Sequence, residues 1–270
     1  MKHASVAIVL VLAACSAEPR PTQADRLNAT GADALAAGRP RAAAARFSAA
    51  AEASGAVDDR ASLSRDLHNR GLALIAAGEI TAGCADLTES LRLAEAIAAP
   101  ADERLRTRLA LAAALVALGR NAEAEPCLAQ GLAYADTAAP LRARALASRA
   151  ALALRRGDAA AAATDLDAAA RLCDDDSGAQ GTVAIIRGHL ALQGGDAAGA
   201  AAAYAAATAA FRASGEHAGI TAALEGEARA AEKAGDRVAA ARAWRRAAQV
   251  PYGGLDARDR RIAEALRLER

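Results

Sequence analysis

One turn recurs six times along this chain, and it constrains the possible fold more than any other feature. Each copy has an apolar segment, a glycine, one or two polar residues and then an alanine-rich segment. The glycines are Gly38, Gly78, Gly119, Gly157, Gly195 and Gly235, so successive copies are 40, 41, 38, 38 and 40 residues apart. A fixed period of this size predicts a solenoid of helical hairpins. Each glycine is expected to end one helix in a left-handed cap, which a β-carbon disfavours.

Alignment on these glycines gives columns of uniform side-chain size. The residues seven positions before the glycine are small, and so are those five and twelve positions after it. The residues nine positions after the glycine are large: Phe47, Leu87, Leu128, Leu166, Tyr204 and Trp244. We expect the small residues to let two helices approach where they cross, and the large residue to fill the groove between successive hairpins.

Composition favours close-packed helices over a sheet. Hydrophobic residues make up 54% of the 270 residues, but aromatic residues only 2%, because alanine dominates the apolar count. Alanine is the best helix former and loses no side-chain entropy on burial. The 33 Lys and Arg residues balance 32 Asp and Glu residues. A dedicated nucleic-acid binder usually carries a basic excess, so we expect no nucleic-acid partner.

The spacing predicts six pairs of helices and one final helix. The pairs are 24–37 with 40–54, 60–77 with 80–97, 102–118 with 121–135, 140–156 with 159–173, 179–193 with 197–213, and 217–234 with 237–249. The final helix, 256–269, is expected to begin at Asp256 as its N-cap and to cap the stack. Isolated helices of this length are marginal in water, so stability should come from stacking. Residues 24–270 are therefore expected to form one all-α domain.

The aligned columns resemble the tetratricopeptide repeat (TPR) family over roughly residues 24–250. The resemblance implies a right-handed solenoid of about six hairpins whose first helices line a concave face for an extended peptide or a partner helix. The chain departs from the family in its period, which is longer than about 34 residues, and in lacking the late proline in most repeats. The usual tryptophan of the first helix is replaced by Leu27, Leu67, Arg108, Leu146, Ala184 and Leu224.

The N-terminal residues predict a lipoprotein leader. A short basic start precedes an apolar run over 4–14, which is shorter than the about twenty residues that cross a bilayer. The run ends in Leu12-Ala13-Ala14-Cys15. This resembles the lipobox of bacterial lipoproteins, which implies that residues 1–14 are a signal peptide and that Cys15 receives lipid such as palmitate. Residues 15–23, with two prolines, would be a tether.

The N-terminal residues allow two interpretations besides that of a lipoprotein leader. An ordinary secretory signal cleaved after Ala14 and an uncleaved anchor remain alternatives. Ser16 follows Cys15, whereas Asp at this place is the inner-membrane retention signal of Gram-negative lipoproteins. For a Gram-negative source, the resemblance therefore implies an outer-membrane anchor that faces the periplasm.

Motifs for catalysis or metal binding are not found in the sequence. It contains no His-Glu-x-x-His, Gly-x-Ser-x-Gly, phosphate-binding loop or Cys-x-x-Cys pattern, so we expect neither an enzyme nor a cofactor or metal. Apart from Cys15, the cysteines are Cys84, Cys127 and Cys173. We expect small buried residues there, and a Cys84–Cys127 disulfide stays open because an oxidising compartment would permit it.

A candidate partner site follows from the resemblance. The column twelve or thirteen residues before the glycine holds three arginines in repeats two to four, and other polar residues lie deeper in the groove. These residues are Arg65, Arg106 and Arg144, followed by His68, Asn69, Arg155 and His189. Asn69 and Arg106 resemble part of the carboxylate clamp of chaperone-binding members, although Asn28, Ala32 and Ala110 occupy the other clamp positions.

Arginine forks match carboxylates bidentately. The hypothesis is therefore a groove that takes an acidic segment or a C-terminal carboxylate of a protein or peptide partner. The alternative is that these arginines are solvated and paired within the chain.

The sequence thus predicts a membrane-anchored, periplasm-facing scaffold or adaptor that helps to assemble an envelope complex. A regulator or accessory that docks on a cell-wall enzyme is the alternative. An enzyme with unrecognised catalytic groups ranks third.

Overall fold

The computed structural model describes residues 21–134, 136–252 and 254–269, and in them it contains thirteen α-helices and no strand. The helices are α1 (Gln23–Ala36), α2 (Pro40–Ala56), α3 (Arg60–Ala76), α4 (Ile80–Ala96), α5 (Ala101–Ala117), α6 (Asn121–Leu132), α7 (Ala139–Arg155), α8 (Ala159–Ala170), α9 (Ser177–Gln193), α10 (Ala197–Ser214), α11 (His217–Ala234), α12 (Arg237–Gln249) and α13 (Gly254–Glu269). The predicted all-α fold is confirmed. The predicted signal peptide, Cys15 and most of the tether lie outside the described residues.

The six repeated glycines occupy the turns inside the hairpins, as predicted. Their φ angles run from +68° at Gly38 to +88° at Gly78, the left-handed region that favours glycine. An added β-carbon at any of the six would meet no atom within 4 Å. The backbone conformation, rather than a lack of space, therefore requires glycine at these turns.

The turns between hairpins also contain left-handed residues, which the sequence pattern did not reveal. They are Asp58, Ala98, Asp174 and Gly215. Three of these four residues are not glycine, so no repeated residue type marks this second set of turns.

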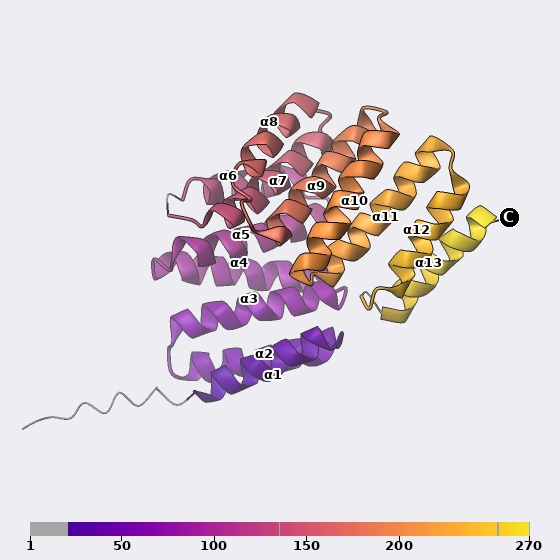
Figure 1. Ribbon diagram of the computed structural model, residues 1–270. Coiled ribbons are helices and arrows are strands. Elements are labelled where there is room, and N and C mark those ends of the chain that lie inside the picture. The colour runs from indigo at the N-terminus through magenta and orange to yellow at the C-terminus, as the bar shows by residue number, and fades with distance from the viewer. Residues whose placement is uncertain (1–20, 135, 253, 270) are drawn as a thin grey trace, which may run out of the picture.

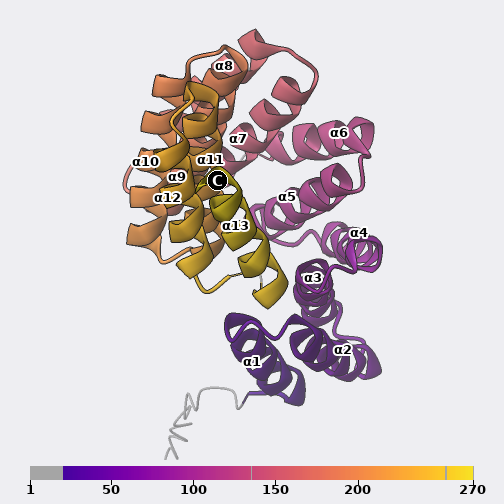
Figure 2. The same cartoon turned by 90° about the vertical axis from the view of Figure 1, so that its right-hand side faces the viewer.

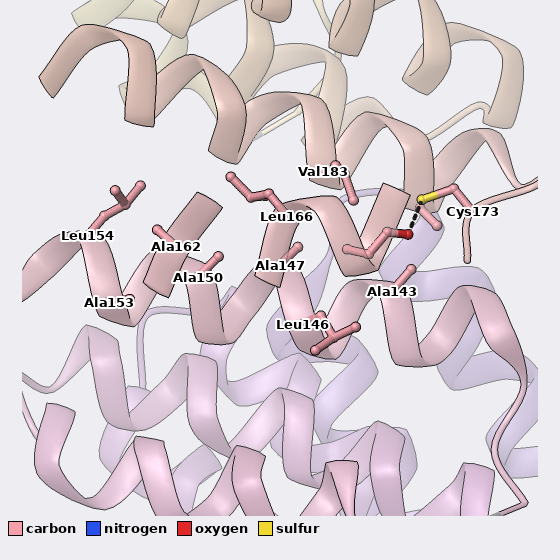
Figure 3. Packing of buried hydrophobic residues seen from close by; sticks show 12 residues of the cluster. Ala143, Leu146, Ala147, Ala150, Ala153, Leu154, Ala162, Leu166, Cys173 and Val183 are labelled. Carbon is pink, nitrogen blue, oxygen red and sulfur yellow. Dashed lines mark hydrogen bonds between the residues drawn. The ribbon is translucent and has the colours of Figure 1, made fainter. Parts of the chain in front are cut away.

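The columns of small and large residues meet in the core. A β-carbon added to Gly31 would lie 2.6 Å from the Phe47 ring, and one added to Gly188 would lie 2.6 Å from the Tyr204 ring. The large side chain thus fills the space that the small residue leaves open. In the hairpin formed by α7 and α8, Leu166 lies among small residues of α7 and near Val183 of α9 (Figure 3). All six large residues are buried.

The hairpins stack in chain order and curl into a superhelix (Figure 1). α1, α3, α5 and α7 line the inner side, whereas α2, α4, α6 and α8 lie on the outer side (Figure 2). The curl brings α11 to α13 back toward α1 (Figure 2). None of the described helices combines the length and hydrophobicity needed to span a bilayer.

The last helix starts earlier than expected. α13 begins at Gly254, so Asp256 lies in its first turn and the prediction of Asp256 as the N-cap was wrong, because the two preceding residues already adopt helical backbone. α13 packs on the last hairpin. Arg261 is buried there and donates to Glu225 Oε1 of α11 at 2.8 Å.

Arg108 occupies the position of the usual TPR tryptophan in the third hairpin, and it is buried. Its guanidinium donates to Tyr134 Oη at 2.8 Å, to Gln130 Oε1 at 2.8 Å and to Glu95. A satisfied polar network therefore replaces an aromatic ring at this position, which agrees with the rule that buried charges are paired.

Candidate partner-binding groove

An open cleft of ≈ 640 Å³ lies on the inner side of the superhelix. Its lining residues are Ala32, Leu35 and Ala36 of α1, Phe47 of α2, Asn69 and Leu72 of α3, and Glu216. Glu216 directly precedes α11, so the curl places the start of the last hairpin opposite the first two. We refer to this feature as the apolar cleft, because Asn69 and Glu216 are its two polar lining residues.

Arg144 connects the last three hairpins near the apolar cleft. Its Nη2 atom lies 2.9 Å from Glu216 Oε1 and 3.6 Å from Asp176 Oδ1. A β-carbon on Gly178 would lie 2.1 Å from both Arg144 Nη2 and Glu216 Oε1. The ion pair therefore sits directly on the α9 backbone, and glycine is the residue that leaves room for it.

The other two arginines of the predicted column also have carboxylates within the chain. Arg65 Nη2 lies 3.2 Å from Asp25 Oδ1, and Arg106 Nη2 lies 3.9 Å from Asp102 Oδ2. Both arginines are exposed, and exposed pairs of this kind contribute little to stability. Arg65, Arg106 and Arg144 are thus paired in the way that the alternative interpretation of the sequence described.

His68 and Arg106 lie close together on α3 and α5. His68 Nδ1 lies 3.0 Å from Thr107 Oγ1. Burial, and then the charge of Arg106, lower the pKa of His68. A neutral imidazole with a hydroxyl partner is therefore the favoured form of His68, rather than a cation that would attract an acidic partner.

Asn69 belongs to a polar network between α1 and α3. Its Nδ2 atom donates to Asn28 Oδ1 at 3.1 Å, and Asn28 in turn donates to Asp66. Asp66 is fully buried and accepts a hydrogen bond from Ser54 Oγ at 2.6 Å. One N–H of the Asn69 side-chain amide is thus used inside the chain, which leaves the second N–H for a partner.

Arg155 and His189 form a second group on the inner face of the last three hairpins. His189 lies edge-on to the Tyr204 ring, with 5.7 Å between the ring centroids. Desolvation, and then Arg229 and Arg155, lower the pKa of His189. Arg155 of α7 and Arg229 of α11 thus lie on the two helices that pack against α9, and both of their charges act on His189.

Tyr204 and Glu216 are the features of the inner face that sequence reasoning missed. The pattern identified Tyr204 only as a large core residue, but its hydroxyl is buried and has no hydrogen-bond partner in the described part of the chain. Burial raises the pKa of Tyr204 to about 12. Glu216 lies in a turn between hairpins, and the one sequence signal for it is the neighbouring Gly215.

The cysteines are buried with free thiols at Cys84, Cys127 and Cys173. No Cys84–Cys127 disulfide forms, and Cys173 Sγ donates to Ala169 O at 3.2 Å (Figure 3). Burial is the main cause that raises the pKa of Cys127 and Cys173, so both thiols are poor nucleophiles. Across the described ranges, no three His, Cys, Asp or Glu side chains gather where they could hold a metal ion.

Comparison with known proteins shows similarity at the level of structure. No sequence-family model matches the chain, and no curated protein matches it significantly in sequence. A tetratricopeptide repeat protein from Parabacteroides merdae aligns with 90% of this chain and 98% of its own length, with a TM-score of 0.50 and 12% identity. The Rap conjugation gene regulator of plasmid pLS20, in complex with the Phr* peptide, aligns over 91% and 73%, with a TM-score of 0.61 and 11% identity.

A chain of the Cut9–Hcn1 tetramer of the APC/C aligns with 92% of this chain, with a TM-score of 0.64 and 16% identity. This chain spans 44% of the length of that one. At these identities the similarity shows the fold alone, which is a TPR-like helical-repeat solenoid.

Proposed function

We propose that this chain is a lipid-anchored, periplasm-facing scaffold or adaptor that holds a segment of a protein partner on its inner face during assembly of an envelope complex. The observation that supports it best is the apolar cleft. Leu35 and Leu72 in its lining are partly exposed. Because the apolar cleft lies between the first two hairpins and the start of the last one, a bound segment could contact both parts of the superhelix.

The shape of the apolar cleft agrees with a polypeptide occupant. A concave, mostly apolar site with a small number of polar groups is typical of ligand recognition. One of the similar structures holds a peptide, Phr*. An apolar segment of a partner would bury its side chains against α1 and α3, while Asn69 and Glu216 offer polar contacts along the lining.

The anchor rests on the lipobox-like residues Leu12-Ala13-Ala14-Cys15. Thr22, where the capping box of α1 begins, lies seven positions after Cys15. At about 3.5 Å per extended residue, this tether would keep α1 within about 25 Å of the membrane surface. Since α1 also lines the apolar cleft, the partner would be held close to the membrane.

Site-specific photo-crosslinking tests the role of the apolar cleft. A photo-reactive residue at Leu72 should capture a partner in intact envelopes. The same residue at Val57, which is 74% exposed in the turn between α2 and α3, should capture far less. Equal capture at both positions would refute the proposal that the apolar cleft holds the partner.

Metabolic labelling tests the anchor. A Cys15→Ser variant should lose palmitate and move to the soluble fraction, whereas the matched Cys173→Ser variant changes a buried thiol and should keep both. Membrane retention of Cys15→Ser without label would contradict lipid anchoring.

The identity of the partner captured by crosslinking also distinguishes the two candidate functions. An assembly subunit supports the scaffold function, and a cell-wall hydrolase or synthase supports the accessory role.

A further inference from the structure

The inner face of the last three hairpins carries cationic and imidazole groups that the chain itself leaves largely unpaired. Arg155 ends α7, His189 lies on α9 and Arg229 lies on α11, and α9 packs against both other helices. Arg155 and His189 are exposed, and neither makes a side-chain hydrogen bond or ion pair with any described residue. These three residues differ from the paired arginines beside the apolar cleft.

Two carboxylates lie near Arg229, and both have other partners: Arg261 pairs with Glu225, whereas Trp244 and Arg267 donate to Glu232. Arg229 Nη2 lies 3.4 Å from Glu225 Oε2, while Arg261 Nε donates to Glu225 Oε1 at 2.8 Å. The Arg229 guanidinium also lies 5.7 Å from the centre of the Trp244 ring. Its side chain remains 55% exposed. Arg229 is thus oriented by its neighbours but can still receive a further acceptor.

A buried hydroxyl lies beneath these residues. Tyr204 Oη has no hydrogen-bond partner in the part of the chain that the structure describes, although buried polar groups are almost always bonded. Its ring fits against two glycines: an added β-carbon would lie 2.6 Å from it at Gly188 and 2.4 Å at Gly226. His189 contacts the ring edge, and the charge of Arg229 opposes the rise in the pKa of Tyr204. The Tyr204 ring therefore lies against His189, and the Arg229 charge acts on its hydroxyl.

These groups share one chemical preference. Two guanidinium forks and one imidazole N–H are all hydrogen-bond donors. Desolvation by the surrounding helices, and then the charges of Arg229 and Arg155, lower the pKa of His189, so its neutral form offers a single N–H and adds no charge. A carboxylate accepts several hydrogen bonds at once and matches a guanidinium bidentately.

Apolar side chains on both sides of His189 indicate where the carboxylate comes from. Ile185 and Leu192 lie one helical turn before and after His189, on the same face of α9, and both are half-buried. An occupant that continues in both directions would cover both of them. A chain terminus would leave one of them uncovered. An acidic side chain within an otherwise apolar segment therefore fits better than a C-terminal carboxylate.

We infer that Arg155, His189 and Arg229, next to the buried Tyr204 ring, form a subsite that binds an acidic side chain of an apolar partner segment. We call this the acid subsite. It rests on the proposed function, because it assumes a polypeptide on the inner face. It moves the acidic contact away from Arg65, Arg106 and Arg144, which the chain pairs internally.

The acid subsite can be tested with short peptides and histidine-ring NMR on the full chain. The probe is an acetylated and amidated Leu-Glu-Leu peptide, and the neutral control is Leu-Gln-Leu with the same ends. The glutamate peptide should shift the His189 ring signals with a dissociation constant on the order of 1–10 mM. The signals of His68 and His217 serve as internal controls. An equal shift with the glutamine peptide would overturn the inference.

Variants assign the contacts. Arg155→Gln and Arg229→Gln should each weaken binding of the glutamate peptide about tenfold, as loss of one charge-assisted hydrogen bond predicts. Tyr204→Phe removes a hydroxyl that has no exposed surface and should bind normally, as should the matched Arg65→Gln variant. Arg155 is exposed and unpaired among the described residues, so its replacement keeps the test valid if other variants unfold. Unchanged affinity in both Arg155→Gln and Arg229→Gln would refute the acid subsite.

A third peptide separates the two sources of carboxylate. Leu-Gln-Leu with a free C-terminus should bind no better than its amide. If it alone shifts the His189 signals, the assignment to an acidic side chain is wrong. Failure of these peptides with successful crosslinking at Leu72 would reject the acid subsite and leave the proposed function standing. The reverse result would reject the role of the apolar cleft.

Discussion

The first three hairpins and the last three close the same glycine turn with different side chains. The second helices of the last three each begin after an aspartate whose carboxylate accepts from a backbone N–H of the first helical turn, whereas no side chain caps the corresponding helices of the first three. The capping residues are Asp158, Asp196 and Asp236, and their counterparts are Arg39, Glu79 and Arg120. The backbone turn is therefore set by the glycine, and the side chain after it adjusts stability.

The arginines beside the apolar cleft and those of the acid subsite differ in a similar way. Beside the apolar cleft, Arg65 and Arg106 have acidic partners from within the first three hairpins, and Arg144 has two from the last two. Farther along, Arg155 has none among the described residues, and Arg229 shares Glu225 with Arg261. Arginines at different places in the repeat thus differ in their availability to a partner, because pairing depends on the carboxylates that neighbouring hairpins supply.

The largest expected loss of stability comes from a substitution where two helices cross in the first three hairpins. A β-carbon on Gly83 would lie 2.6 Å from the Gly71 carbonyl oxygen and 2.7 Å from Ile75 Cγ1. Gly83→Ala should therefore lower the free energy of unfolding by about 3 kcal/mol, the upper end for overpacking, as measured by urea denaturation. The last three hairpins carry alanine at this position. Ala200→Gly is the matched reverse change and should cost about 1 kcal/mol. Equal costs for the two variants would show that the close crossing is not the cause.

The next effect concerns the buried carboxyl group between α1 and α3. Asp66→Ala leaves Ser54 Oγ and Asn28 Nδ2 without this acceptor. The loss should be about 2 kcal/mol, since unsatisfied buried donors are costly. The corresponding residues of the fifth and sixth hairpins are Val183 and Ala223, so the network is special to the first half. Exposed Asp33→Ala is the control and should change thermal unfolding little. A stable Asp66→Ala variant would argue that water replaces the carboxyl group.

A smaller effect tests the caps. Asp196→Ala removes the acceptor for the Gly199 N–H at 2.8 Å, and should cost about 1 kcal/mol. Arg39→Ala removes no cap and should change stability by less than about 0.5 kcal/mol. Glu79→Asp introduces the capping residue of the last half into the first and should gain up to about 1 kcal/mol. If Glu79→Asp destabilises the chain instead, the turns of the two halves are not equivalent in backbone geometry.

The smallest effect is a pH dependence. The pKa of His68 lies below its usual value of 6.5 in the folded chain, first because of burial and then because of Arg106. Unfolded chains therefore bind more protons as the pH falls below about 6.5, and stability decreases in that window. The fall in melting temperature from about pH 7.5 to about pH 5.5 should be smaller in His68→Gln than in the unmodified chain.

The same comparison can be made in the second half. His189→Gln should act in the same direction as His68→Gln, because desolvation is again the first cause of its lowered pKa. If the melting temperature of His68→Gln fell as much as that of the unmodified chain over this pH range, or more, the assignment of this pH dependence to His68 would be wrong.

Local patterns were enough to predict the hairpins. The six glycine turns and the large residues nine positions later all lie where the sequence placed them, and most helix ends agree within two residues. α6 and α8 end three residues earlier than predicted, at Leu132 and Ala170, because nothing in the alanine-rich sequence marks their ends. Asp256 showed the same weakness at the start of α13.

The sequence by itself determined the repeat, because φ at a glycine and the volume of a side chain are properties of single residues that recur with the period. Only the tertiary structure decided what faces the inner side. The apolar cleft forms because Glu216 lies opposite α1, and Arg144 is paired because three successive hairpins meet there. The Tyr204 ring is buried because two glycines from different helices leave room for it. These contacts depend on small rotations that add up from hairpin to hairpin, and no single residue encodes their sum.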